Sequence, residues 1–146
     1  MQSEKRVWVV FTNQTDFKAL SFLKPGYRHC FVIMHDGQQW ISVDPMAHYM
    51  SVKSLDNIPK SFDFSSYFSD MGHDVVEVTS CVEEPPKCSA PPMFFTCVEV
   101  CKRVLGVHKF TIFTPWQLYQ YLHEKEKSYG KLYINSDRSS TAEGCG

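Results

Sequence analysis

The sequence lacks long apolar runs. Its longest unbroken apolar segments are five residues each, 7–11 (VWVVF) and 30–34 (CFVIM), whereas a helix needs about 20 such residues to cross a bilayer. The N-terminus, MQSEKR followed by the first of these runs, also lacks the apolar stretch of a secretory signal. We therefore expect no membrane span, no secretory signal and a cytoplasmic location.

An excess of charge of either sign is also missing. The chain carries 15 Lys and Arg against 16 Asp and Glu, for a formal net charge of -1. Nucleic-acid binding depends on a basic surface that neutralises phosphates, so no nucleic-acid partner is expected. The 146 residues are 43% hydrophobic and show no internal repeat, which predicts one compact domain with its own core. We place this domain at residues 1–134 and a polar tail at 135–146.

Cysteine knuckles are absent, although the chain has six cysteines. No CxxC pair occurs, and a structural zinc site is typically built from such pairs. Without an export signal, disulfides are not expected either. We expect no metal and no cofactor, and the thiols are left for chemistry or packing. A zinc-stabilised binding module using Cys81, Cys88, Cys97 or Cys101 with a histidine stays an alternative.

The pattern of apolar residues and turn signals predicts an α+β fold. A proline-rich loop over 81–92 separates a strand-rich front from a back that carries helices. Thr96 is followed three positions later by Glu99, and Thr114 by Gln117, the capping-box spacing at a helix start. The expected strands are 7–11, 27–34, 39–44, 49–55, 74–79 and an edge strand at 132–134, with a helical turn within 62–70 and helices over 96–105 and 114–127.

A hairpin centred on Asp36-Gly37 predicts a pairing register. If these two residues form the turn, or if a four-residue loop over 35–38 does, Ile33 faces Trp40 and His29 faces Asp44. Directly opposed side chains lie close enough for a carboxylate to accept an imidazole N–H. The pair then has the arrangement of a general base and the residue that orients it. The alternative is a structural ion pair between neighbouring strands.

Cys97 follows the expected cap Thr96 and so occupies the first helical position. There the free N–H groups and the positive end of the helix dipole favour a thiolate. Cys101, one turn later, is expected to be an inert core thiol, although from the sequence the two could exchange roles. The alternative for Cys97 is a small buried hydrophobic residue, the common fate of a free cysteine.

Three segments together resemble a known family: RHCF at 28–31, WISVDP at 40–45 and TCVEV at 96–100. They are similar to the NlpC-type cysteine hydrolases with a circularly permuted papain-like fold. This resemblance implies an antiparallel sheet packed against a nucleophile-bearing helix and a second C-terminal helix. It also implies that Cys97 attacks an amide or ester carbonyl, that His29 is general base and acid, and that Asp44 orients His29.

The same resemblance implies the class of substrate. Members of the family cut peptidoglycan peptides, or act as amidases and acyltransferases on small amides and lipids. A cell-wall substrate fits this chain if it is phage-encoded, and the protein would then be associated with a virion and its assembly partners. Trp40, Phe31 and His48 are expected to line the substrate pocket. The alternative is a catalytically inactive papain-like interaction module or phage structural component.

Overall fold

The computed structural model describes residues 5–14, 18–80 and 95–129. Five strands, three α-helices and one 3₁₀ helix make up this part of the chain. In chain order they are β1 (Lys5–Thr12), η1 (Lys18–Phe22), β2 (His29–His35), β3 (Trp40–Pro45), β4 (Met50–Leu55), α1 (Phe64–Asp70), β5 (Asp74–Ser80), α2 (Cys97–Leu105) and α3 (Pro115–Tyr129). The expected α+β class is therefore confirmed.

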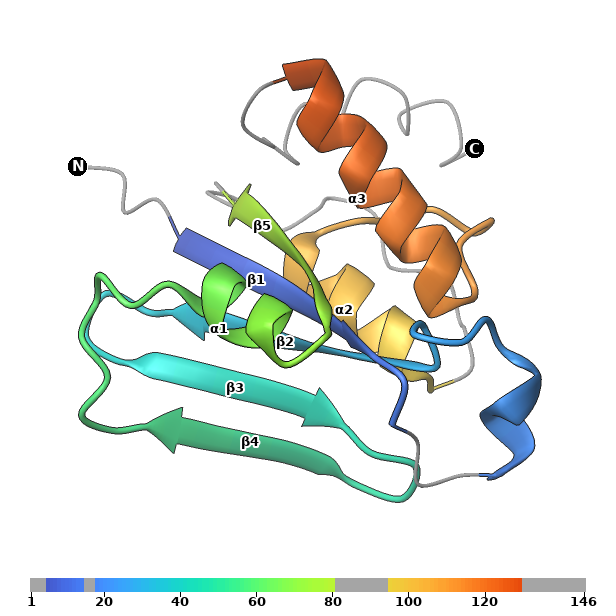
Figure 1. Cartoon of the computed structure of the whole chain (residues 1–146), viewed down its shortest axis with the longest axis horizontal. Coiled ribbons are helices and arrows are strands. Elements are labelled where there is room, and N and C mark those ends of the chain that lie inside the picture. Colours follow the sequence, from blue (N-terminus) through green and yellow to red (C-terminus); the bar gives the residue numbers. More distant parts are fainter. Residues whose placement is uncertain (1–4, 15–17, 81–94, 130–146) are drawn as a thin grey trace, which may run out of the picture.

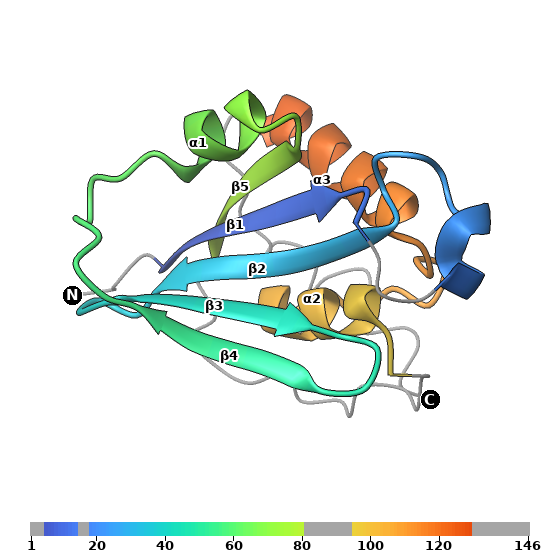
Figure 2. The same cartoon turned by 60° about the horizontal axis from the view of Figure 1, so that its bottom comes forward.

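The strands form a single antiparallel sheet in the order β4-β3-β2-β1-β5. Helix α1 lies on one face of this sheet and α2 on the other (Figures 1 and 2). Both faces of β1, which lies between β2 and β5, are covered, and this explains why its apolar residues run without alternation.

Each face of the sheet has its own core. On the face under α2 and α3, side chains such as Val9, Cys30 and Val32 pack against Cys101 and Leu118. The opposite face carries an aromatic cluster of Trp8, Ile33, Trp40 and Phe64, the last of which begins α1. These cores fix α2 against β2, and this contact positions the start of the helix.

The loop between β2 and β3 lies one residue later in the chain than the four-residue loop that the sequence allowed. The Asp36 carboxylate accepts the backbone N–H groups of Gln38 and Gln39, each at 2.8 Å. The side chain thereby closes a four-residue loop over 36–39, and His35 pairs with Trp40. The two-residue turn expected at Asp36-Gly37 does not form, because this carboxylate satisfies N–H groups that the shorter turn would place differently.

The expected register is consequently wrong by two residues. Ile33 lies opposite Ser42 and not opposite Trp40, and His29 is not directly opposed to Asp44. Because side chains alternate with a period of two, a shift of two residues leaves every side chain on its expected face. His29 and Asp44 therefore still share a face, as diagonal neighbours.

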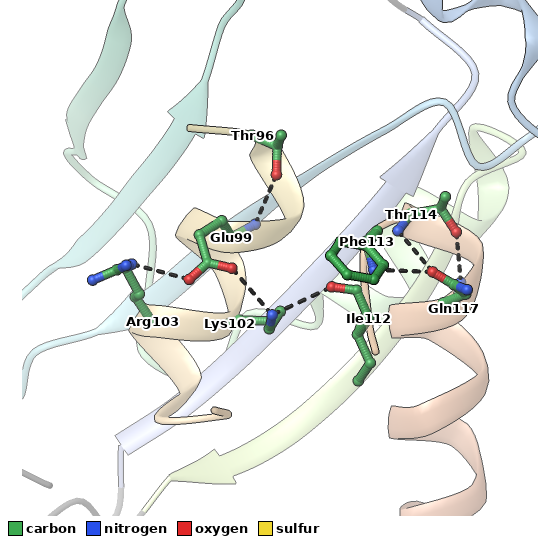
Figure 3. Close-up of polar contacts among 8 residues, drawn as sticks. All are labelled: Thr96, Glu99, Lys102, Arg103, Ile112, Phe113, Thr114 and Gln117. Atoms are coloured by element: carbon green, nitrogen blue, oxygen red, sulfur yellow. Dashed lines mark hydrogen bonds and ion pairs between the residues drawn. The ribbon is translucent and has the colours of Figure 1, made fainter. Parts of the chain in front are cut away.

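Helix α2 begins and ends with clear capping interactions. The Thr96 hydroxyl accepts the N–H of Glu99 at 3.2 Å, and Gly106 ends the helix in the left-handed region at φ 70°. The Glu99 carboxylate does not complete the capping box predicted here, because it contacts Lys102 Nζ at 3.1 Å and Arg103 Nε at 3.2 Å (Figure 3).

The start of α3 has the complete capping box. Gln117 Oε1 accepts the N–H of Thr114 at 3.1 Å and that of Phe113 at 2.9 Å. The Thr114 hydroxyl accepts the N–H of Gln117 in return, at 3.3 Å (Figure 3). Two predicted helix starts are thus confirmed, one with a partial box and one with a full box.

Glu99 and Lys102 form a buried ion pair, and this gives a stability prediction. The two residues are 8% and 2% exposed, and Lys102 Nζ also donates to the Ile112 carbonyl at 3.3 Å. Glu99→Ala leaves the Lys102 charge buried without its carboxylate, so we expect a loss of about 3 kcal/mol in the free energy of unfolding. Urea denaturation followed by circular dichroism measures it.

The matched control breaks an exposed ion pair. Arg6 Nε and Glu77 Oε1 are 3.0 Å apart, with side chains 42% and 41% exposed. Glu77→Ala should cost less than about 1 kcal/mol, because water screens an exposed pair. Equal losses in the free energy of unfolding for Glu99→Ala and Glu77→Ala would contradict a stabilising role of the buried Glu99–Lys102 pair.

Several expectations concern residues outside the described part of the chain. They are the proline-rich loop at 81–92, the edge strand at 132–134, and the domain boundary at 134 with its tail. Among the helices of the described part, none has the length and apolar character needed to cross a membrane.

Candidate active site

Three chain segments meet at one end of the sheet. His29 is the first residue of β2, Asp44 lies next to the end of β3, and Cys97 is the first residue of α2. The beginning of β2, the end of β3 and the beginning of α2 lie at the same end of the molecule (Figure 1). The three residues singled out from the sequence are thus brought together, and all three line one cavity.

His29 and Asp44 are in direct contact. His29 Nε2 lies 2.7 Å from Asp44 Oδ1, a short distance typical of a charge-assisted hydrogen bond. The two side chains are 16% and 33% exposed, so water screens the pair only in part. Since Nε2 donates to the carboxylate, Nδ1 is the ring nitrogen left to face another group.

Cys97 is that other group. Its helix position follows from Thr96, which has extended backbone angles and caps α2. The Cys97 side chain is partly buried against the core under α2 and lies near enough to His29 for each residue to shift the pKa of the other. Cys97, His29 and Asp44 therefore lie in one row, in that order, at the wall of the cavity.

The surroundings of Cys97 stabilise its thiolate. A hydrogen bond from the Cys30 thiol contributes most to lowering the pKa of Cys97, from an ordinary value of 9.0 to about 5. Burial of the sulfur opposes this shift in pKa, whereas the His29 ring and the backbone N–H of Cys30 add to it. At neutral pH the Cys97 sulfur is consequently charged and nucleophilic.

His29 is held in its protonated form. Burial lowers the pKa of His29, but the hydrogen bonds with Asp44 and Cys97 and the charges of these two partners outweigh burial and raise it to about 10. Between about pH 5 and about pH 10 the two residues thus form a thiolate–imidazolium pair. Such a pair supplies a nucleophile and a general acid at the same time.

Two further cysteines lie beneath Cys97. Cys30, the second residue of β2, and Cys101, one turn along α2, are both 0% exposed, and their sulfurs are 3.6 Å apart. Burial raises the pKa of the Cys30 thiol well above its usual range, with Cys101 and Cys97 contributing further. Cys30 therefore stays a neutral thiol. The expected core position of Cys101 is confirmed, and Cys97 is the partly exposed member of the two helical cysteines.

The cavity in front of Cys97 has a volume of about 740 Å³ and a mainly apolar wall. Among its described lining residues only Arg28 and Asp44 carry a formal charge, apart from histidines. Several large apolar side chains around it are more than half exposed: Phe22 (80%), Met71 (56%), Phe95 (62%) and Phe113 (58%). Exposed apolar side chains gathered at a cavity are typical of a binding site.

The predicted pocket residues are only partly correct. Phe31 and His48 line the cavity. Trp40 does not, because it is 0% exposed in the aromatic cluster, where it packs edge-on against Phe64 and its indole N–H donates to the Pro59 carbonyl. Trp40 begins β3, whereas Asp44 lies at the other end of this strand, so the indole is far along the strand from the site.

Sequence reasoning missed other parts of the site. His73 and Phe113 line the cavity from distant segments, and nothing local in the sequence links them to His29. Cys30, by contrast, could have been found. It neighbours His29 on a strand and so points to the opposite face, where the apolar stripe of the Cys97 helix packs.

The part of the chain that the structure describes contains no cluster of three or more histidine, cysteine or acidic residues with the geometry to hold a metal ion. Cys81 and Cys88, which the zinc alternative uses, lie outside the described residues. The side chains at this site instead interact among themselves, with His29 between Asp44 and Cys97.

The chain was compared with protein-family models, with curated proteins and with solved structures, and no significant match was found. The function of the protein is therefore inferred from the geometry of this site and from the three sequence motifs that form it.

Proposed function

We propose that this protein is a thiol-dependent acyl-transfer enzyme, a hydrolase or acyltransferase of amides or esters, with a permuted papain-like fold. The observation that carries the proposal is the connected row of Cys97, His29 and Asp44 at one cavity, with the His29–Asp44 contact at 2.7 Å. The chain order also supports it, since the strands with histidine and aspartate precede the helix with the cysteine, as in the permuted family.

In the first step the Cys97 thiolate attacks the substrate carbonyl carbon. The negative charge that develops on the carbonyl oxygen needs hydrogen-bond donors. The N–H groups of Cys97 and Val98 are in the first turn of α2 and have no acceptor one turn earlier in the helix. They are suited to this role, and Val98 lines the same cavity.

The proton moves through His29. Its imidazolium donates a proton to the leaving amine or alkoxide as the tetrahedral intermediate collapses, and a thioester on Cys97 remains. Neutral His29 then takes a proton from water or from another acceptor, which attacks the thioester. Release of the acyl product restores the thiolate and the imidazolium, while Asp44 keeps the ring oriented throughout.

The cavity wall indicates an apolar acyl group. A peptidoglycan stem peptide carries several charges, and apart from the histidines, of which His29 is already paired with Asp44, the described lining offers only Arg28 as a cation for its carboxylates. An alkyl chain, by contrast, would bury apolar area against Phe31, Phe113 and their neighbours, at about 0.8 kcal/mol for each methylene group. We therefore propose an ester or amide of an apolar acid as the substrate.

The test is acylation of the intact protein by activated esters of different chain length. After incubation with p-nitrophenyl octanoate, mass spectrometry should show one octanoyl group, mapped to Cys97. Acylation should be at least about 10-fold faster than with p-nitrophenyl acetate. Phe113→Ser should reduce this preference several-fold, because Phe113 lines the cavity.

Phe110→Ser is the matched control. Phe110 is 59% exposed, almost the same as Phe113, but it does not line the cavity, so the preference should persist. If Cys97 is acylated equally fast by the octanoate and acetate esters, the proposal of an apolar substrate is wrong, whereas the proposal of thiol-dependent acyl transfer still stands. Amines released from a peptidoglycan preparation, without that preference, would favour the wall peptide. No adduct with any donor would favour a non-catalytic module.

A further inference from the structure

Three thiols form a short row through the interface between β2 and α2. Cys97 and Cys101 are separated by one helical turn on α2, and Cys30 projects from β2 against the same helix. The Cys30 sulfur lies 3.6 Å from that of Cys101, and Cys97 packs against the cluster of buried side chains that contains both, near enough for Cys30 to lower the pKa of Cys97. In the proposed acyl transfer only the Cys97 sulfur forms a bond to the substrate. Cys30 is therefore a second thiol beside the site with no covalent role in that reaction.

Cys97 and Cys30 differ in their access to solvent and in their charge. Cys97 lines the cavity and is partly exposed, whereas Cys30 is 0% exposed. A small oxidant such as hydrogen peroxide reaches Cys97 first and reacts with a thiolate in preference to a thiol. The oxidised sulfur then lies beside the buried thiols of the cluster that Cys97 packs against, and a sulfenic acid condenses readily with a neighbouring thiol.

We propose that Cys97 and Cys30 form a redox modification site, in which Cys30 resolves the oxidised nucleophile as a reversible Cys97–Cys30 disulfide. As regulation of catalysis this rests on the function proposed above, because the disulfide blocks the nucleophile. The oxidation itself needs only the two thiols. The disulfide would link β2 to the first turn of α2 within the existing packing.

The steps balance with peroxide as the oxidant. The Cys97 thiolate attacks one peroxide oxygen and the O–O bond breaks, which yields Cys97 sulfenic acid and hydroxide. The Cys30 sulfur then attacks the Cys97 sulfur, the S–O bond breaks, and hydroxide leaves. The Cys30 proton and one proton from solvent convert both hydroxides to water. Two thiols thus lose two electrons to one peroxide, and a dithiol reductant reverses the change.

The experiment is peroxide titration of the reduced full-length protein, followed by intact mass and peptide mapping without reduction. We expect a mass loss of two hydrogen atoms and a cross-linked peptide pair containing Cys30 and Cys97. Dithiothreitol should restore alkylation of Cys97 in full. In Cys30→Ala, Cys97 should proceed to sulfinic and sulfonic acid, and dithiothreitol should no longer restore alkylation.

Cys101→Ala is the matched control, because it removes the other buried thiol that contacts Cys30 and should leave the cross-link intact. A cross-link of Cys30 to Cys101 alone, or sulfinic acid at Cys97 in the unaltered protein, would overturn the proposal. Peptide mapping of the unaltered protein decides it even if Cys30→Ala does not fold. These readouts need no substrate, so their failure is distinguishable from a failure of acyl transfer.

Discussion

Cys97→Ala is expected to abolish labelling by iodoacetamide at about pH 6 and to remove the acyl adduct. At this pH an ordinary thiol is almost entirely protonated, whereas the pKa of Cys97 is lowered to about 5. Hydrolysis of an activated ester should fall by about 10³-fold or more, because the remaining groups cannot form a covalent intermediate. Peptide mapping after labelling identifies the modified cysteine.

Cys101→Ala provides the control for this prediction. Cys101 lies one turn further along α2 and is fully buried, so its removal should leave labelling and acylation at Cys97 in place. Loss of labelling in Cys101→Ala, with retention in Cys97→Ala, would reverse the assignment of nucleophile and core thiol. Labelling retained in both variants would place the reactive thiol elsewhere in the chain.

His29 is expected to influence the pH at which alkylation of Cys97 rises and the pH at which hydrolysis falls. In the unaltered protein, alkylation of Cys97 should rise through about pH 5, where the thiolate forms, and stay high at alkaline pH. Hydrolysis should rise at the same pH but fall above about pH 10, where His29 loses the proton that the leaving group needs. His29→Ala should shift the rise in alkylation to higher pH, because it removes a positive charge beside the sulfur.

Asp44→Asn separates the orienting role from the chemistry. Because the charge of Asp44 helps raise the pKa of His29, this variant should move the alkaline limb of hydrolysis to lower pH. We expect the rate to fall by roughly 10²- to 10⁴-fold, since an amide no longer favours the imidazolium. His48→Ala, which changes another histidine at the cavity, should leave both limbs in place. Equal effects of Asp44→Asn and His48→Ala would contradict the triad.

Local patterns in the sequence were sufficient for much of this architecture. The strands, the helix starts at Thr96 and Thr114, and the shared face of His29 and Asp44 follow from alternation and capping, which depend on residues a few positions apart. The prediction that His29 and Asp44 share a face was correct despite an error of two residues in the register, because side chains on a strand alternate with a period of two. The catalytic roles of Cys97, His29 and Asp44 stay predictions until the variants above are measured.

Contacts between distant segments could not be read from such patterns. Cys30 and Cys101 are 71 positions apart, and their contact exists only because β2 packs under α2. The loop at 36–39 is closed by the Asp36 carboxylate, and this closure sets a register that the turn signal in the sequence did not give. Apolar side chains carry no directional signal for their partners, so the shape of the cavity and the thiol beneath the nucleophile emerged only when the layers were packed together.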